Sequence, residues 1–386
     1  MSLDVFRGAT IASMMLVNNP GTWDHLYEPL EHAPWHGWTF TDTIFPFFLW
    51  IVGVAIPFSL GRKVEEGADR SKLFLGILRR SLILIAIGVA LNSFTYFLSI
   101  FLSPNHEGVG YWMNQLVEHV RYPGVLQRIG VCYFFASLIF LNTKIRGQII
   151  WTGALLAIYW ILMKCVPVPG YGAGVMDLHG NFSEFIDTMV FNGHVFRDSK
   201  TYDPEGVIST IPAIATTLFG ILTGQFLRCE KTNSTEKTAW LFVVGSLLMF
   251  AAEIMSFWMP INKRLWTSSY SVLMAGLAMN VFAVYYWLVD VKGYKTWAKP
   301  LAIYGMNAIT VFILAGVLGR ISVDLKVSDG KIALKTYLYE HTFGMLATNK
   351  LVAPETASMF WGLIVYMFGL YLVAWFLYRR KWFLRF

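Results

Sequence analysis

The chain has 386 residues, with 31 Lys and Arg against 24 Asp and Glu, which gives a formal net charge of +7. Hydrophobic residues make up 56% of the chain and charged residues only 14%, well below the roughly one quarter of charged residues in a soluble domain. Because so few charges cannot cover a water-facing surface, the composition excludes a soluble enzyme, a disordered protein and a fibrous protein. The scattered cysteines Cys132, Cys165 and Cys229 predict neither a disulfide framework nor a cysteine-based metal site.

Ten stretches are apolar enough to form membrane-spanning helices, each of which needs about 20 mainly apolar residues. Their long apolar runs, without the alternation of a membrane β-barrel, predict an all-α fold. No internal repeat divides the chain, so we expect one polytopic transmembrane helical bundle, a single domain over residues 1–386. No small-residue cleavage site follows the first span, so we expect the N-terminus to be retained. The predicted spans are 3–19, 39–60, 81–102, 122–142, 149–166, 208–227, 238–257, 268–289, 300–320 and 356–378.

The distribution of basic residues orients this bundle. The segments on one side hold 18 of the 31 Lys and Arg in only 54 residues. By the positive-inside rule this side is cytoplasmic, and with ten spans both termini lie there. The basic face suits lipid phosphates and other anions, so the positive charge does not indicate nucleic acid. The basic segments are 61–80, 143–148, 228–237, 290–299 and 379–386.

All eight histidines lie in the loops on the opposite, outer side of the bundle. Because histidine titrates near neutral pH, outer loops that combine it with Asp, Trp and Tyr are typical of a place for chemistry or sugar binding. The alternative is that these are ordinary polar loop residues. The histidines are His25, His32, His36, His106, His119, His179, His194 and His341.

One segment joins a histidine-rich aromatic loop, which includes His32, to a predicted helix with Asp42 in its first turns. A histidine held by a carboxylate can take a proton from an attacking amine or hydroxyl, as general-base catalysis requires. A loop histidine that is merely capped or faces water is the alternative. A metal site is not favoured, because no cysteine accompanies the histidines and their spacing matches no strong zinc pattern.

Charged residues also occur inside predicted spans. Asp4 and Arg7 are three residues apart and therefore share one helix face, where a local ion pair is the simplest explanation. Arg128 needs a carboxylate such as Asp203 or Asp42, a phosphate or a water-filled cavity, because an unpaired guanidinium inside a span is costly.

Polar side chains at the outer ends of spans are candidates for binding a sugar. The two acids before the predicted span 208–227 interact favourably with the helix dipole, and they can also bind an ammonium group. An aromatic residue there belongs either to the site or to the interfacial belt. The candidate substrate-binding residues are Asp203, Glu205, Asn262, Lys263, Trp266 and Trp35.

Six motifs, in order over nearly the whole chain, resemble the transmembrane acetyltransferase family of heparan-α-glucosaminide N-acetyltransferase and its bacterial NagX-like relatives. This resemblance implies a polytopic enzyme that moves acetyl from cytosolic acetyl-CoA to the amine of an aminosugar such as glucosamine on the far side. It aligns His32 with the family's active-site histidine, Asn18 with a nearby asparagine and Asp42 with an aspartate. The motifs are SLDVFRG, HAPWHGWTFTDTIFPFFLWIVG, PGVLQRIGVCY, YDPEGVISTIPAI, INKRLWTSSY and GMNAI.

The resemblance also implies roles for these residues. His32 is expected to act as general base or covalent acetyl carrier, Asp42 to orient it, and Asn18 to position the acetyl group. Because CoA is a polyanion, its phosphates are expected at the basic cytoplasmic face and its acyl arm inside the bundle. The residues expected to hold acetyl-CoA are Arg7, Arg79, Arg80, Arg380, Gln127, Arg128 and Asn307.

The implied location is the bacterial cytoplasmic (inner) membrane, in contact with lipids. The expected partner is a small aminosugar or the end of a glycan, without metal or nucleic acid, and a homodimer is allowed. Two other functions stay open. One is an aminosugar transporter without chemistry, which the lack of paired repeats disfavours. The other is an O-acyltransferase acting on envelope glycans, which differs only in its acceptor.

Overall fold

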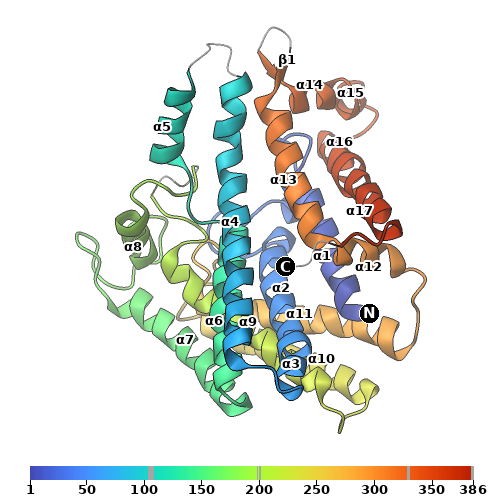
Figure 1. Cartoon of the computed structure of the whole chain (residues 1–386). Helices are drawn as coiled ribbons and strands as arrows, with labels where there is room; N and C mark the ends of the chain where they lie inside the picture. Colours follow the sequence, from blue (N-terminus) through green and yellow to red (C-terminus); the bar gives the residue numbers. More distant parts are fainter. Residues whose placement is uncertain (103–107, 198, 200, 328–330, 384–386) are drawn as a thin grey trace.

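The computed structural model describes residues 1–102, 108–197, 199, 201–327 and 331–383. Within these ranges the chain is almost entirely helical, as predicted (Figure 1). Of the outer-loop histidines, His106 lies outside the described residues.

The helices follow one another along nearly the whole described chain. They are α1 (Ser2–Asn18), α2 (Phe40–Ile56), α3 (Arg62–Glu65), α4 (Arg70–Leu102), α5 (Val109–His119), α6 (Val125–Asn142), α7 (Ile145–Cys165), α8 (Phe182–Phe191), α9 (Val207–Arg228), α10 (Ser234–Ser256), α11 (Ser268–Tyr286), α12 (Lys299–Met306), α13 (Ala308–Asp324), α14 (Leu334–Glu340), α15 (Phe343–Thr348), α16 (Pro354–Trp361) and α17 (Gly369–Arg379). A 3-10 turn, η1 (Glu28–Leu30), and three π-helical turns complete them: η2 (Pro57–Gly61), η3 (Trp287–Val291) and η4 (Gly362–Phe368). The strands β1 (Lys326–Val327) and β2 (Ile332–Ala333) form an antiparallel hairpin with Lys326 opposite Ala333.

Eight helical segments of the described chain are long and apolar enough to cross a membrane, which confirms the predicted transmembrane bundle. A ninth arises if α12 and α13 are counted together, but they bend by 74° around Asn307, so the predicted span 300–320 is not one straight helix. The predicted span 3–19 is α1, a helix of 17 residues that is shorter than the other eight. The expected number of ten spans is therefore not confirmed, and the side on which the termini lie stays a prediction. The eight segments are Phe40–Glu65, Arg70–Leu102, Val125–Asn142, Ile145–Cys165, Val207–Arg228, Ser234–Ser256, Ser268–Val291 and Pro354–Arg379.

Helices α2 and α9 form the centre of the bundle. Their apolar stretches are 72% buried, whereas those of α7 and α10 are only 22% buried and line the periphery. The two central helices touch through their backbones. A Cβ atom on Gly53 of α2 would lie 2.0 Å from the carbonyl oxygen of Thr217, and one on Gly220 of α9 would lie 2.1 Å from that of Trp50. This close approach fixes α2, and with it Asp42, against α9.

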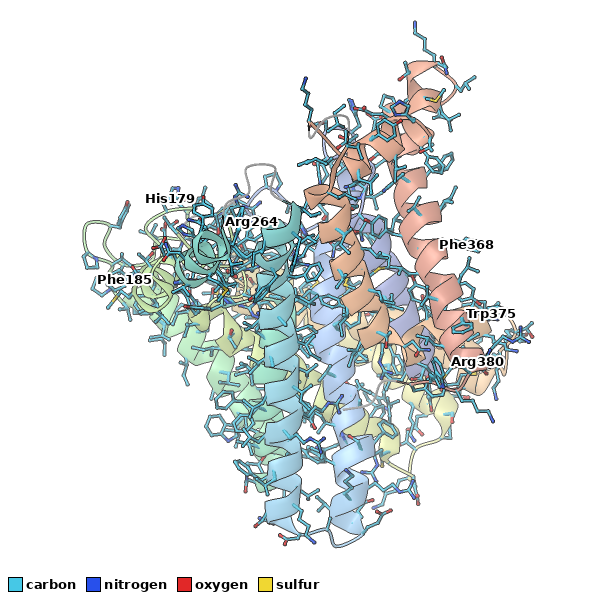
Figure 2. All side chains as sticks on the ribbon, turned by 45° about the horizontal axis from the view of Figure 1, so that its top comes forward. His179, Phe185, Arg264, Phe368, Trp375 and Arg380 are labelled. Carbon is cyan, nitrogen blue, oxygen red and sulfur yellow. The ribbon has the colours of Figure 1, made fainter. Side chains whose placement is uncertain are left out.

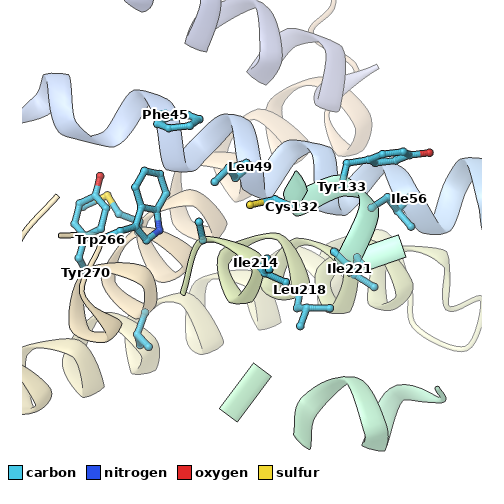
Figure 3. Packing of buried hydrophobic residues seen from close by; sticks show 14 of the residues in the cluster. Phe45, Leu49, Ile56, Cys132, Tyr133, Ile214, Leu218, Ile221, Trp266 and Tyr270 are labelled. Carbon is cyan, nitrogen blue, oxygen red and sulfur yellow. The ribbon is translucent and has the colours of Figure 1, made fainter. Parts of the chain in front are cut away.

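The core continues from these helices to the loop before α11 (Figure 3). Phe45 and Leu49 of α2 belong to the same buried cluster as Cys132 of α6 and Ile214 of α9. The ring of Trp266 meets Phe45 edge-on, with centroids 5.0 Å apart. The loop that carries Trp266 is therefore anchored in the core beside the start of α2.

A second hydrophobic cluster joins α1 to α12, α13 and α16 on the right of Figure 1. It includes Ile11, Met15, Val311 and Trp361. Figure 2 shows Arg380 at the end of α17 on the opposite side of the molecule from Arg264 and the loops around it. The loop 19–39 leads from α1 to α2, and these two helices also pack on each other through Phe6 and Phe47.

The contact between α2 and α9 predicts the effect of one substitution. Gly220→Val would push a side chain into the backbone of Trp50, which cannot move aside as a flexible side chain can. Overpacking of this kind costs about 1–3 kcal/mol or more, so we expect a clearly lower apparent Tm for the detergent-solubilised protein. Gly153→Val in α7 is the matched control, since a Cβ there meets nothing within 4 Å. Equal Tm values for the two variants would contradict the close packing of α2 on α9.

Candidate active site

Asp42 lies in the first turn of α2 and is only 1% exposed. Its Oδ2 atom accepts hydrogen bonds from the backbone N–H groups of Ala33 and Thr39, each at 3.0 Å. The bond from Thr39 belongs to the capping box that starts the helix. The bond from Ala33 ties the preceding loop to the same carboxylate. One buried oxygen therefore fixes both the helix start and the loop that carries His32.

The second carboxylate oxygen of Asp42 holds His32. Its Oδ1 atom lies 2.7 Å from Nδ1 of His32, whose side chain is 44% exposed. A carboxylate only accepts hydrogen bonds, so Nδ1 carries a proton and a neutral His32 has its free lone pair on Nε2. The arrangement presents a base or nucleophile at the protein surface, oriented by a buried acid.

Lys263 joins this pair from the loop before α11. Its Nζ lies 3.0 Å from Nδ1 and 3.2 Å from Nε2 of His32, and 3.5 Å from Oδ1 of Asp42. Burial lowers the pKa of Lys263 below its ordinary value, although Asp42 and Glu205 act in the opposite direction. Lys263 was predicted to bind a sugar, and the structure places its ammonium on the histidine ring.

Backbone bonds join the loop of His32 to the loop of Lys263. The N–H of Gly37 donates to the carbonyl of Ile261 at 2.8 Å. Asn262 is fully buried, and its Oδ1 accepts the N–H of Leu265 at 2.9 Å. The Tyr270 hydroxyl donates to the backbone carbonyl of Asp42 at 2.5 Å. Asn262, also predicted to bind sugar, thus organises the loop that delivers Lys263.

The acids Asp203 and Glu205, predicted to bind an ammonium group, are both paired with Arg121. Arg121 donates from Nε to Oδ2 of Asp203 at 2.7 Å and from Nη2 to Oδ1 at 2.6 Å, and Nη2 also bonds Glu205. Burial opposes the ionisation of Glu205, but Arg121 and Arg128 outweigh it and hold the pKa of Glu205 below its ordinary value. Arg121 was missed as a functional residue. The sequence carried one indication of such a residue: the two acids at positions 203 and 205, just before a helix, need a nearby cation.

Arg128 is only 2% exposed, and its guanidinium makes no ion pair with Asp203 or Asp42, which bind Arg121 and His32 instead. It donates from Nη2 to the hydroxyl of Ser209 and to the carbonyl of Gly206, and it lies 5.1 Å from the ring centroid of Trp266. Within the part of the chain that the structure describes, its buried Nε and Nη1 atoms have no hydrogen-bond partner. Of the three alternatives expected for Arg128, direct pairing with Asp203 or Asp42 does not occur, so a phosphate or a water-filled cavity stays open.

The two tryptophans predicted to contact a sugar lie at different depths. Trp266 is 1% exposed and packs in the core between Phe45 and Arg128, so it belongs neither to an interfacial belt nor to the surface. Trp35 is half-buried, donates from Nε1 to the carbonyl of Met176 at 2.9 Å, and lies edge-on to Tyr202. Trp35 therefore remains the tryptophan nearer the outer surface.

A cavity of about 550 Å³ lies between α1, α4, α6 and α13. His32 and Asp42 are not among the described residues that line it. Charged side chains connect the cavity to the surroundings of His32. Arg121 lines the cavity and binds Glu205, and the negative charge of Glu205 acts on Lys263. The polar lining residues include Asn18, Asn19, Gln127, Arg121, Arg197, Arg320 and Lys335.

The residues predicted to bind acetyl-CoA are distributed over several elements. Gln127 lines the cavity, while Asn307 donates to the carbonyl of Ala374 at the bend between α12 and α13. Arg7 pairs with Asp4 at 3.0 Å and lies close enough to Arg80 for the two charges to repel.

The remaining predicted arginines contact aromatic rings or solvent. Arg80 lies 4.7 Å from the ring centroid of Tyr133, Arg380 lies 5.6 Å from that of Phe376, and Arg79 is exposed. Among the described side chains, no group of three or more His, Cys, Asp or Glu is arranged to hold a metal ion.

The sequence has relatives among characterised protein families. The family model for "Heparan-alpha-glucosaminide N-acetyltransferase, catalytic" matches residues 1–259, a range that contains Asn18, His32 and Asp42. The heparan-alpha-glucosaminide N-acetyltransferase of Mus musculus is 29% identical over 361 residues, and that of Homo sapiens is 28% identical over 362 residues. Each alignment covers 81% of this chain and 52% of the relative, so the chain spans about half the length of these relatives.

Asp187 of α8 is a second buried acid, and nothing in the sequence pattern distinguished it. Its Oδ1 accepts the N–H of Val207 at 3.0 Å, and its Oδ2 accepts the N–H of Asp203 at 3.2 Å. The turn that carries Asp203 and Glu205 is thereby held at the start of α9. Burial raises the pKa of Asp187 to about 6.

This raised pKa predicts how stability depends on pH. Because the folded pKa of Asp187 lies above the ordinary value of 3.8, its contribution to stability is fully present below that value and is lost as the pH rises through 6. The Asp187→Asn variant lacks this titration. Between pH 4 and pH 7 we therefore expect the free energy of unfolding of the wild type to fall by on the order of 2–3 kcal/mol relative to that of the variant. The apparent Tm of the wild type should fall relative to that of the variant over the same range. Parallel Tm curves for the two proteins would contradict the assignment.

Proposed function

The chain belongs to the heparan-alpha-glucosaminide N-acetyltransferase family, and from this premise we propose that it is a membrane-embedded acetyltransferase. We propose that its donor is acetyl-CoA and its acceptor the amine of an aminosugar on the outer side of the membrane. Glucosaminide is the acceptor that the names of the two relatives carry.

One observation carries this proposal, namely the half-exposed His32 held at 2.7 Å by the buried Asp42. Acyl transfer to an amine requires a group that removes a proton from the attacking nitrogen, and an oriented neutral imidazole is suited to this task. A residue with a merely structural role gains nothing from leaving Nε2 at the surface. The pair resembles the base and orienting acid of hydrolytic triads in its roles.

The transfer follows from this geometry. Nε2 of His32 accepts the proton of the acceptor amine as the nitrogen attacks the thioester carbonyl carbon. The carbon–sulfur bond then breaks, and the proton passes from the imidazolium to the departing CoA thiolate. In a second route Nε2 itself attacks the thioester carbonyl carbon, the carbon–sulfur bond breaks and CoA leaves as its thiolate. The acceptor amine then attacks the acetyl group on His32, the bond to Nε2 breaks, and the proton lost by the amine neutralises the thiolate. Asp42 stabilises the imidazolium in the first route and fixes the ring in both.

The donor's acyl arm fits the cavity beside α1. Asn18 is exposed to this cavity, and its amide N–H groups can stabilise the oxyanion that develops on the thioester carbonyl. Gln127 lines the same cavity, while its amide N–H groups donate to the carbonyls of Tyr122 and Pro123. We place the donor's phosphates toward the basic cytoplasmic segments, where Arg7 and Arg80 lie close together. The acceptor approaches the exposed edge of His32, with Trp35 as a neighbouring aromatic surface.

The proposal is tested with purified protein in nanodiscs, radiolabelled acetyl-CoA and glucosamine. His32→Gln removes the base and should lower the transfer rate by about 10²–10⁴-fold. The matched control is His341→Gln, which makes the same replacement at an outer-loop histidine bonded only to the backbone carbonyl of Tyr337 among its described hydrogen bonds. Full transfer by the His32 variant, or equal loss in the control, would refute the role of His32.

A second experiment separates the two routes. Wild-type protein is incubated with acetyl-CoA in the absence of any acceptor, quenched and digested, and the peptide containing His32 is weighed by mass spectrometry. A mass increase of one acetyl group, absent in His32→Gln, indicates the route through acetylated His32. An unmodified peptide from protein that is active with glucosamine indicates direct transfer to the amine.

A further inference from the structure

The position of Lys263 relative to His32 is unusual for a hydrogen bond. Its Nζ is nearly equidistant from Nδ1 and Nε2, at 3.0 Å and 3.2 Å. A donor in the plane of an imidazole reaches one nitrogen only, because the ring atoms block a similar approach to both. The two distances therefore place the ammonium over the face of the ring, while Asp42 holds Nδ1 at the ring edge.

Lys263 is held in this place by its surroundings. Its loop is bonded through Ile261 to Gly37, in the same loop as His32. The ammonium lies 3.5 Å from Asp42 and also faces the carboxylate of Glu205, while its side chain is only 17% exposed. The neighbouring Arg264 donates to the hydroxyl of Tyr202 instead.

We propose that Lys263 is a positioning residue for His32, which keeps the ring unprotonated and fixed in the plane that aims Nε2 at the acceptor. The inference deepens the proposed acetyl transfer and rests on it. A positive charge over the ring makes uptake of a second proton less favourable, whereas Asp42 makes it more favourable. The two residues together hold the ring between a carboxylate at its edge and an ammonium over its face.

The charged groups around the ring are consistent with this role. Asp42 approaches from α2 and Lys263 from the loop before α11, and the charges of Glu205 and Arg264 act on the ammonium of Lys263. The burial that lowers the pKa of Lys263 also keeps water from screening its charge. A lysine that served only to bind a sugar has no reason to lie against both nitrogens of the base.

The test measures the ring directly, without depending on acetyl transfer. Diethyl pyrocarbonate modifies unprotonated imidazole, and mass spectrometry gives the rate of modification of His32 between pH 5 and pH 8. In Lys263→Met the pH of half-maximal rate should rise by about 1 unit, since a unit charge in contact has been removed. Lys263→Arg keeps the charge and should stay near the wild type. Arg264→Met, next along the chain, is the matched control and should not shift the curve.

Acetyl transfer gives the second readout. Lys263→Met should lower kcat most strongly below pH 7 and leave the KM for glucosamine nearly unchanged. An unshifted modification curve together with a raised KM would show that Lys263 binds the sugar, and would overturn the inference. A wild-type protein that transfers no acetyl, but whose curve shifts in Lys263→Met, would refute the proposed function while leaving the contact between Lys263 and His32 in place.

Discussion

The burial of the Asp42 carboxylate at the start of α2 is the constraint on which the rest of the site depends. An ionised carboxylate removed from water is costly unless every lone pair finds a partner. Asp42 meets this demand by accepting from Ala33 and Thr39 on one oxygen and from His32 on the other. The partners that stabilise the acid are therefore the same groups that shape the site. Capping of the helix, closure of the loop and orientation of the histidine follow from one buried charge.

A second layer of ions supports this centre from the start of α9. Asp187 holds the turn before α9, and that turn supplies Asp203 and Glu205 to Arg121. The close contact of α2 and α9 brings the two helix starts together, so the two acid-rich turns share one end of the bundle. Arg121 belongs to both the ion cluster and the wall of the cavity, and thereby connects the space beside Asn18 with the surroundings of His32.

The sequence predicted the helical bundle well, because the need for long apolar runs in a membrane is a local property of the chain. It did not predict the bend between α12 and α13. Asn307 was predicted to hold acetyl-CoA, and a buried amide looks the same in sequence whether or not the helix bends there. His32 and Asp42 were predicted because they are only ten residues apart and match a family motif. The sequence did not identify Lys263 as a partner of His32 or Arg121 as a partner of the two acids, because tertiary packing brings these residues together from distant loops. The pairing of Asp203 and Glu205 with Arg121 likewise depends on tertiary packing, and their role as sugar ligands stays a prediction.

The central claim is that Asp42 and His32 act as one unit in acetyl transfer. A double-mutant cycle with His32→Gln, Asp42→Asn and the combined variant, measured as kcat/KM for glucosamine, tests it most directly. If the carboxylate acts through the histidine, the combined variant will be no slower than His32→Gln alone, because removing the orienter of an absent base has no further effect. Losses that multiply, so that the combined variant is slower by the product of the two single effects, would show that the residues act independently and would contradict the account.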